Sequence, residues 1–345
     1  MTVLHETANR NNRIVASWLL LCCALVFAMV VLGGVTRLTG SGLSMVDWRP
    51  VTGILPPLTA EQWQDSFELY QQSPEFQKIN FHMSVDEYKN IFWLEYLHRL
   101  LGRAIGMVFL LPMLFFAFTG KIKKPEFPKY LLMFVLGGLQ GVLGWYMVKS
   151  GLVNNPHVSQ YRLTAHLLAA IVIYAYMFWV AMSLLYSHLE ESRNRLYKRT
   201  SALLGLVTLT VISGGFVAGL KAGLTYNTFP LMGNRWVPEG MMVLSPAWRN
   251  FFDNLVTVQF NHRVLAISTL VLIMIYWVFA RRELIPRRVR PMLNALPLVA
   301  VIQVSLGIGT LLLKVPTALA ATHQAVALVL FTVMLYLCHR LRGVR

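Results

Sequence analysis

Apolar residues in this chain occur in long uninterrupted runs. The segments Ile14–Val35 and Pro291–Leu313 contain no charged residue at all. A helix needs roughly 20 apolar residues to cross about 30 Å of hydrocarbon, and runs of this length recur along the chain. The pattern predicts an all-α integral membrane protein with eight transmembrane helices, at about 14–36, 92–119, 128–148, 161–187, 201–222, 255–280, 290–313 and 316–339.

Composition supports this class and excludes another. The chain is 56% hydrophobic and only 13% charged, with a mean hydropathy of +0.55. Its net charge of +16 would suit a nucleic-acid-binding protein only if the basic residues lay on a solvated domain, and the sequence has no such domain. We therefore expect the membrane bilayer, and no nucleic acid, as a partner.

The basic residues gather in alternate loops, which predicts the topology. Of the 31 Lys and Arg residues, 18 lie before the first run, in 120–129, 188–200 and 281–290, or after His339. By the positive-inside rule these segments are cytoplasmic, as are both termini, and the long segments 37–91 and 223–254 are external. Residues 1–13 resemble a cytoplasmic tail rather than a mitochondrial presequence, which predicts a multi-pass protein of a bacterial inner (plasma) membrane.

The chain shows an internal duplication. One offset, 181 residues, separates Gly33-Gly34 from Gly214-Gly215 and Gly42-Leu43-Ser44 from Gly223-Leu224-Thr225. Close helix packing alone explains the glycine pairs, but the shared spacing still indicates a repeat. Because each half holds an even number of spans, the prediction is two pseudo-symmetric four-helix bundles in parallel orientation. The expected domains are 1–13, an N-terminal half 14–187 with the external loop 37–91, a cytoplasmic linker 188–200, and a C-terminal half 201–345.

Four of the nine histidines fall within predicted spans, at matched places in the two halves. They are His98, His166, His262 and His323, all a few residues from the predicted external ends of their helices. Ionisable residues inside a membrane are costly and usually mark function. Facing helices of a bundle can supply two imidazoles to a haem iron, so we expect His98 to pair with His166 and His262 with His323.

Copper or zinc is the rival ligand for such histidines, and spacing alone does not exclude it. Arginines close to the histidines favour haem, because a guanidinium can pair with a haem propionate and a small metal ion does not need one. For Arg162, snorkelling to the external headgroups is an equal alternative. The arginines concerned are Arg99, Arg103, Arg162 and Arg263.

The two halves differ three residues before the first histidine of each pair. Glu95 precedes His98, whereas Gln259 precedes His262. Residues three apart share a helix face, so Glu95 is expected to face the same cavity as His98, where a buried carboxylate is expensive. This difference predicts proton or charge chemistry in the N-terminal pocket only. A structural ion pair of Glu95 with Arg99 or Arg162 is the alternative, and the two roles are compatible.

At these residues the chain resembles the haem A synthases, polytopic enzymes of cytochrome oxidase assembly. The resemblance runs from Gly33 to about Ala327 and is most specific in the segments Gly33–Ser44, Glu95–Arg99, Ala222–Met232 and Thr322-His323-Gln324. Some members carry cysteine pairs in external loops, and this sequence has none there. In that respect, and in its long first external loop, it is similar to the branch that includes the mitochondrial members.

The resemblance implies a specific oxidoreductase. It implies oxidation of the methyl group at C8 of haem O to the formyl group of haem A. It also implies a haem b cofactor ligated by His262 and His323 beside Arg263, and a substrate pocket around His98, His166, Arg99, Arg103 and Arg162 with Glu95 as the catalytic residue. Candidate partners are a haem O synthase that delivers haem O, other cytochrome oxidase assembly factors, and an electron donor that the sequence does not identify.

Two other functions would also use membrane histidines. A haem carrier needs histidines and propionate-pairing arginines, but it gives no reason for Glu95 to differ from Gln259. A di-haem b electron-transfer protein usually needs haems near both membrane faces, whereas all four histidines here are predicted near one face. Both remain alternatives.

Overall fold

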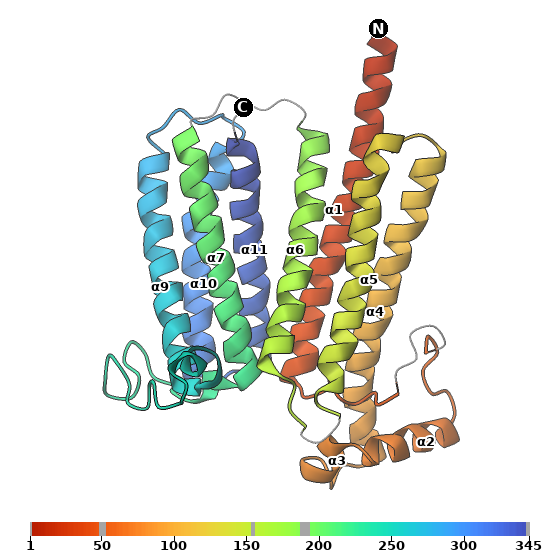
Figure 1. Cartoon of the computed structure of the whole chain (residues 1–345), viewed down its shortest axis with the longest axis vertical. Helices are drawn as coiled ribbons and strands as arrows, with labels where there is room; N and C mark the ends of the chain where they lie inside the picture. Colours follow the sequence, from red (N-terminus) through yellow and green to blue (C-terminus); the bar gives the residue numbers. More distant parts are fainter. Residues whose placement is uncertain (1, 48–52, 153–155, 187–193, 343–345) are drawn as a thin grey trace. The chain divides into compact units, whose positions relative to one another are not determined.

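The computed structural model describes residues 2–47, 53–152, 156–186 and 194–342, and helices dominate them. Eight helices in these ranges are long and apolar enough to cross a membrane, which confirms the predicted all-α membrane class. They are α1 Thr2–Leu38, α4 Val85–Phe118, α5 Phe127–Lys149, α6 Gln160–Leu185, α7 Asn194–Leu220, α9 Leu255–Ala280, α10 Arg290–Leu312 and α11 Thr317–Leu341 (Figure 1).

Short helices occupy the connections. The first segment predicted to be external, 37–91, contains α2 (Ala60–Gln71) and α3 (Pro74–Lys78), and the second, 223–254, contains α8 (Asn250–Asp253). Three 3-10 turns complete the described elements: η1 Lys124–Glu126, η2 Ala222–Leu224 and η3 Ala247–Arg249.

The chain divides into two compact units. Unit 2 is Leu21–Tyr174, and unit 1 holds the chain before Leu21 and from Ala175 onward. The first histidine pair therefore falls within unit 2 and the second within unit 1. In unit 1, close backbone approach joins α7 to α9, α9 to α10, α10 to α11 and α11 to α7, so these helices form a closed four-helix bundle.

Several helices extend beyond their predicted ends. α4 begins at Val85 rather than at 92, because Ser84 caps it: Glu87 N donates to Ser84 Oγ (3.4 Å) and Ser84 N donates to Glu87 Oε2 (2.8 Å). α1 begins at Thr2 rather than at 14. α7 begins at Asn194, inside the predicted linker 188–200, of which 188–193 lie outside the described residues. Polar turns continue these helices beyond the apolar runs, where hydropathy no longer detects them.

The extra turns of α4 support an aromatic cluster in unit 2. Phe67 and Tyr70 from α2 pack against Tyr88, Phe92 and Tyr96 of α4, and all five are buried. Tyr70 stacks on Tyr88 with ring centroids 5.0 Å apart. The cluster fixes this part of the segment 37–91 on the turns of α4 that lead to Glu95 and His98.

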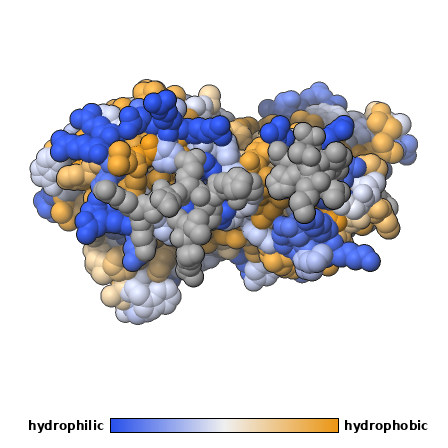
Figure 2. Space-filling model, turned by 90° about the horizontal axis from the view of Figure 1, so that it is seen from above, coloured by the Kyte–Doolittle hydropathy of each residue, from blue (hydrophilic) through white to orange (hydrophobic). Residues whose placement is uncertain are grey.

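Three cysteines are all buried in spanning helices: Cys22 and Cys23 in α1, and Cys338 in α11. The external segments contain none. Seen from the end at which α7 begins and α11 ends, many hydrophilic residues face the viewer (Figure 2). The segments 281–289 and 195–199, predicted to be cytoplasmic, belong to this end of unit 1.

Candidate haem sites

Each histidine pair meets inside one unit. His98 of α4 and His166 of α6 lie within electrostatic interaction range of each other in unit 2. His262 of α9 and His323 of α11 do so in unit 1. The structure therefore brings together the two pairs that the sequence predicted.

Every one of these rings lies against a glycine of the preceding spanning helix. A Cβ added at Gly144 would be 3.0 Å from His166 Cε1, one at Gly214 3.2 Å from His262 Cε1, and one at Gly307 2.9 Å from His323 Cε1. At Gly33 the nearest atom is His98 Nε2, at 3.0 Å. At these distances a methyl group would fit only if the ring moved. The glycines thus form cradles that let an imidazole approach the neighbouring backbone closely.

Hydrogen bonds orient both rings of the second pair. Ser213 Oγ lies 2.8 Å from His262 Nδ1, and the carbonyl oxygen of Gln303 lies 3.1 Å from His323 Nδ1. In the first pair, His166 Nδ1 is buried and has no hydrogen-bond partner among the described residues. The side chain of Gln140 instead donates to the backbone carbonyl of His166 (2.8 Å).

Glu95 is 3% exposed and both its oxygens are occupied. Arg99 donates to Oε1 through Nε (3.1 Å) and Nη2 (2.6 Å). The Ser44 hydroxyl and the Met45 N–H each donate to Oε2 at 2.8 Å. The ion pair of Glu95 with Arg99 that the sequence left open is therefore present.

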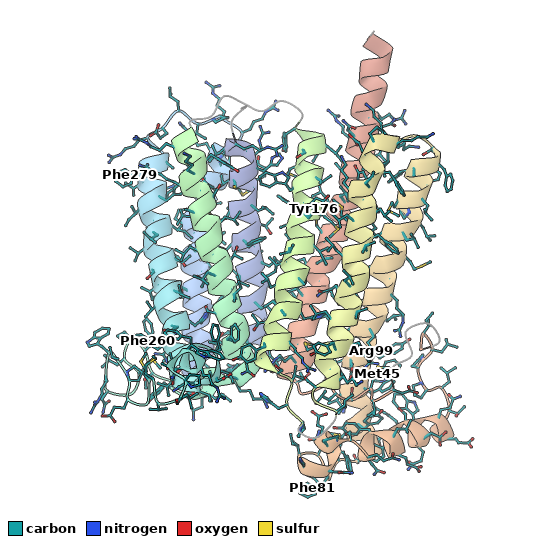
Figure 3. All side chains as sticks on the ribbon, viewed as in Figure 1. Met45, Phe81, Arg99, Tyr176, Phe260 and Phe279 are labelled. Atoms are coloured by element: carbon teal, nitrogen blue, oxygen red, sulfur yellow. The ribbon has the colours of Figure 1, made fainter. Side chains whose placement is uncertain are left out.

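Arg99 also clamps the chain that follows α1. Its Nη2 donates to the Met45 carbonyl (2.8 Å) and its Nη1 to the Asp47 carbonyl (3.1 Å). Figure 3 shows Arg99 beside Met45 at the end of unit 2 that also carries α2 and α3. The guanidinium thus uses its donors within the protein, in addition to any contact with a bound group.

The same clamp recurs in the second half. Arg263 Nη2 donates to the Tyr226 carbonyl and Nη1 to the Thr228 carbonyl, both at 2.8 Å. Tyr226 and Thr228 lie 181 residues after Met45 and Asp47, which is the offset of the glycine pairs. Gln259 is 2% exposed and donates through Nε2 to the Tyr226 carbonyl (3.0 Å). The clamp is common to both halves, and the carboxylate belongs to the first alone.

The other predicted cations lie near the first pair but have different surroundings. Arg162 donates through Nη1 to the Tyr146 carbonyl (2.9 Å), and its guanidinium lies 3.7 Å from the centre of the Tyr146 ring. This contact ties the start of α6 to α5. Arg103 is partly buried on α4, one turn beyond Arg99.

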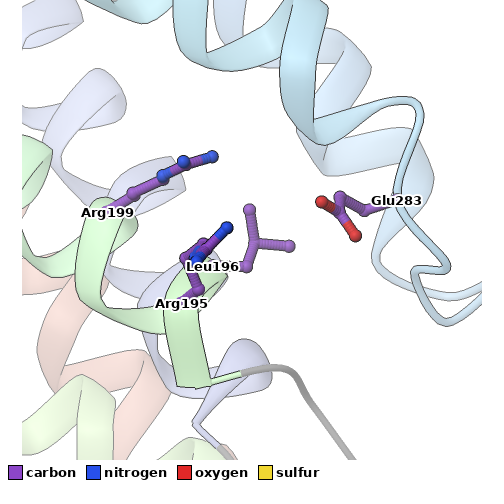
Figure 4. Close-up of a pocket in the computed structure, with 4 residues that line it drawn as sticks. All are labelled: Arg195, Leu196, Arg199 and Glu283. Atoms are coloured by element: carbon purple, nitrogen blue, oxygen red, sulfur yellow. The ribbon is translucent and has the colours of Figure 1, made fainter.

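A cavity of about 200 Å³ opens beside Arg99 in unit 2, lined by Met45, Val46, Arg99, Trp145, Val148, Lys149 and Leu152. Its two cations and apolar walls suit an amphipathic ligand with acidic groups. A second cavity, of about 150 Å³, is lined by Arg195, Leu196, Arg199 and Glu283 (Figure 4). It lies at the start of α7, roughly 28 Å of helix away from Gly214, so it is not part of the histidine site.

The donor sets fit haem better than a bare metal ion. Within the described ranges, no group of three or more His, Cys, Asp or Glu side chains is placed to hold a metal. Structural zinc takes four protein ligands and catalytic zinc three, whereas a haem iron takes one imidazole on each face. Paired imidazoles in glycine cradles therefore suit a flat macrocycle.

Some residues around the histidines were not identified from the sequence. Gly144, Gly307, Ser213 and Gln303 carry contacts to the rings. One signal was available for three of them: Gln140 and Gly144 recur as Gln303 and Gly307 with the same four-residue spacing. Ser213 gave no signal of its own, because the repeat places Leu32 at the equivalent position.

Known proteins match the chain over nearly its whole length. A family model described as "Cytochrome oxidase assembly protein" matches residues 16–335. The "Heme A synthase" of Nitrosospira multiformis is 52% identical over 332 residues, covering 95% of this chain and 93% of the relative. "Heme A synthase COX15" of Homo sapiens is 46% identical over 343 residues, covering 96% of this chain and 84% of the relative.

Proposed function

This chain belongs to the cytochrome oxidase assembly protein family that its match over residues 16–335 identifies, and we propose on that basis how its two histidine pairs work. The protein is a haem A synthase, an oxidoreductase that converts the C8 methyl group of haem O into the formyl group of haem A. Relatives of that name at 46% to 52% identity support the activity. The observation that carries the division of labour is the exchange of Glu95 for Gln259 within an otherwise equivalent clamp.

The C-terminal half is proposed as the electron relay. His262 and His323 would hold a haem b, and a haem held by two imidazoles supplies one-electron transfer without a free axial site. Arg263 would stand beside that haem while its clamp holds the second external segment against α9. The neutral amide of Gln259 adds no charge to this site.

The N-terminal half is proposed as the reaction chamber. His98 and His166 would hold haem O, with Arg99, Arg103 and Arg162 around them. Arg99 and Lys149 line the cavity of about 200 Å³, where two cations would suit the propionates of haem O. Its apolar walls, Trp145 among them, would exclude water from the macrocycle.

Glu95 is proposed as the catalytic residue of that chamber. The overall change, –CH3 + H2O → –CHO + 4 H+ + 4 e−, takes up the oxygen of one water and passes four electrons to an external electron acceptor, so positive charge develops at the carbon and four protons must leave. An ionised carboxylate, fixed by Arg99, Ser44 and Met45, stabilises such charge without reorganising. The same carboxylate can accept a proton from the reacting group when the Ser44 hydroxyl turns to the Ser41 carbonyl, which also lies 2.8 Å from its Oγ. The ion pair with Arg99 sets the position of the carboxylate and is compatible with both roles.

The setting of the protein follows from the same topology. The eight spans make it a multi-pass membrane protein, and we place it in a bacterial inner membrane with both termini cytoplasmic. Haem O supplied by a haem O synthase, an electron donor and assembly factors are the proposed partners. We also propose that it belongs with the members that lack cysteine pairs in their external loops, since its three cysteines lie in spans.

Pigment extraction from the purified protein tests this function against its alternatives. A haem A synthase should yield haem b together with haem O or haem A. A di-haem b electron-transfer protein should yield haem b alone, in about twice the amount per chain. Haem b alone, in a host that makes haem O, would therefore contradict the proposal.

A further inference from the structure

The two halves hold their histidine rings in different ways. Ser213 comes directly before Gly214 on α7 and its hydroxyl reaches His262 Nδ1 at 2.8 Å. The equivalent position before Gly33 is Leu32, which has no polar side-chain atom. The first pair therefore cannot make the hydrogen bond that the second pair makes.

The proton of this hydrogen bond can be placed by counting donors. Ser213 Oγ also lies 2.7 Å from the carbonyl oxygen of Thr210, which can only accept. With its single proton directed at that carbonyl, as the 2.7 Å distance favours, Ser213 Oγ accepts from His262 Nδ1. His262 consequently carries its proton on Nδ1 and leaves the lone pair of Nε2 available for iron.

His323 reaches the same state by a different route. Its Nδ1 faces the carbonyl oxygen of Gln303 at 3.1 Å, and a carbonyl cannot donate. The proton again lies on Nδ1, which leaves Nε2, 3.5 Å from the side-chain nitrogen of Gln303, as the atom for iron. Both rings of the second pair are thus fixed in the tautomer that a haem iron needs.

The rings of the first pair are not fixed by such hydrogen bonds in the described residues. His166 Nδ1 is buried without a hydrogen-bond partner among the described residues. His98 presents Nε2 to the backbone of Gly33, whereas the other three rings present Cε1 to their glycines. The ring of His98 is therefore turned relative to that of its counterpart His262.

We propose that Ser213 is a positioning residue that fixes His262 for a permanently held haem, and that Leu32 at the equivalent place leaves His98 free to release its ligand. This inference rests on the proposed function, in which one haem stays and the other enters as substrate and leaves as product. A hydrogen bond donated from Nδ1 makes Nε2 a stronger base, which favours ferric iron and lowers the reduction potential. A released imidazole suits a site that exchanges its haem.

The test measures the potential and the retention of haem b in the purified full-length protein. Ser213→Ala removes the acceptor and should weaken haem b binding by about 10-fold to 100-fold. If the substitution weakens the binding of ferric haem b tenfold more than the binding of ferrous haem b, the reduction potential rises by about 59 mV. Ser213→Thr keeps the hydroxyl and should restore both values, and Leu32→Ala, the matched change in the first half, should leave both unchanged.

Unchanged potential and haem b content in Ser213→Ala would overturn the inference. If Ser213→Ala loses haem b entirely, Ser213→Thr decides: a folded Ser213→Thr protein that is equally empty would show that the hydroxyl is not the cause. The proposed function fails separately, when the wild-type protein itself binds no haem b or keeps it after His262→Ala. If the wild-type protein binds haem b and Ser213→Ala changes neither the reduction potential nor the haem b content, this inference alone is contradicted.

Discussion

In the N-terminal half, Arg99 holds the backbone carbonyls of Met45 and Asp47, and in the C-terminal half Arg263 holds those of Tyr226 and Thr228. What lies under the two clamps differs, since a carboxylate is buried in the first and an amide in the second. The same backbone clamp thus occurs in both halves, and only the first half places a charge beneath it. A buried charge needs a partner, so Glu95 depends on Arg99 more than Gln259 depends on Arg263.

Packing around the two pairs also differs. In the C-terminal half, α7, α9, α10 and α11 approach closely in a closed ring, while in the described part of the N-terminal half extensive close approach between spanning helices is limited to α4 and α5. A cavity of about 200 Å³ opens beside Arg99 in the N-terminal half, next to the predicted substrate residues.

The largest expected effect is the loss of haem b from one half only. His262→Ala or His323→Ala removes an axial ligand, so haem b binding should fall by at least about 100-fold while the helices stay inserted. Dithionite-reduced difference spectra of purified variants measure this. His82→Ala, at an exposed external position, is the control and should keep its haem. If His262→Ala and His323→Ala both keep their haem b unchanged, the C-terminal half does not hold the relay haem.

A matched pair of clamp variants tests the buried charge. Arg99→Ala leaves Glu95 ionised and buried without its cation, which should cost about 3–5 kcal/mol. Arg263→Ala removes only hydrogen bonds to carbonyls, which should cost about 1–3 kcal/mol. Thermal unfolding midpoints of the purified variants should therefore fall further for Arg99→Ala. Equal shifts would mean that the carboxylate does not distinguish the two clamps.

The glycine cradles give a smaller and more local effect. Gly307→Ala places a Cβ 2.9 Å from His323 Cε1, and Gly144→Ala places one 3.0 Å from His166 Cε1. Each ring must shift, so Gly307→Ala should lower haem b content several-fold, and Gly144→Ala should slow turnover while haem b stays. Gly141→Ala, whose Cβ would meet no atom within 4 Å, is the control. If Gly144→Ala loses haem b, the two histidine pairs do not hold separate haems.

Hydropathy and repeats in the sequence were enough to predict the spans and the histidine pairs. The apolar runs predicted the eight spanning helices, and the four matched histidines form the two pairs that the structure brings within electrostatic range. Helix starts were less accurate, because the capped polar turn at Ser84 extends α4 outside the apolar run. Ser213 escaped notice since its role depends on a contact across helices, which no spacing within α7 encodes.

The ion pair of Glu95 shows a different limit. Spacing allowed Glu95 to face His98, to bind Arg99, or both. The structure adds the Ser44 hydroxyl and the Met45 N–H, contributed from about 50 positions earlier in the chain. No periodicity of α4 could reveal these donors, although the repeated Gly42-Leu43-Ser44 segment marked the place.

The most direct test of the division between the halves is chromatography of haems extracted from cells that express Glu95→Gln, with membrane protein levels measured alongside. In the C-terminal half the amide of Gln259 stands at the equivalent place and donates to the Tyr226 carbonyl. The Glu95→Gln protein should therefore insert into the membrane and keep haem b. Without the carboxylate, haem O should accumulate and haem A should be lost, while Glu68→Gln, at an exposed acid of α2, behaves as wild type. Normal haem A from Glu95→Gln, or a loss of haem b and protein in proportion to haem A, would contradict a catalytic carboxylate in the N-terminal half.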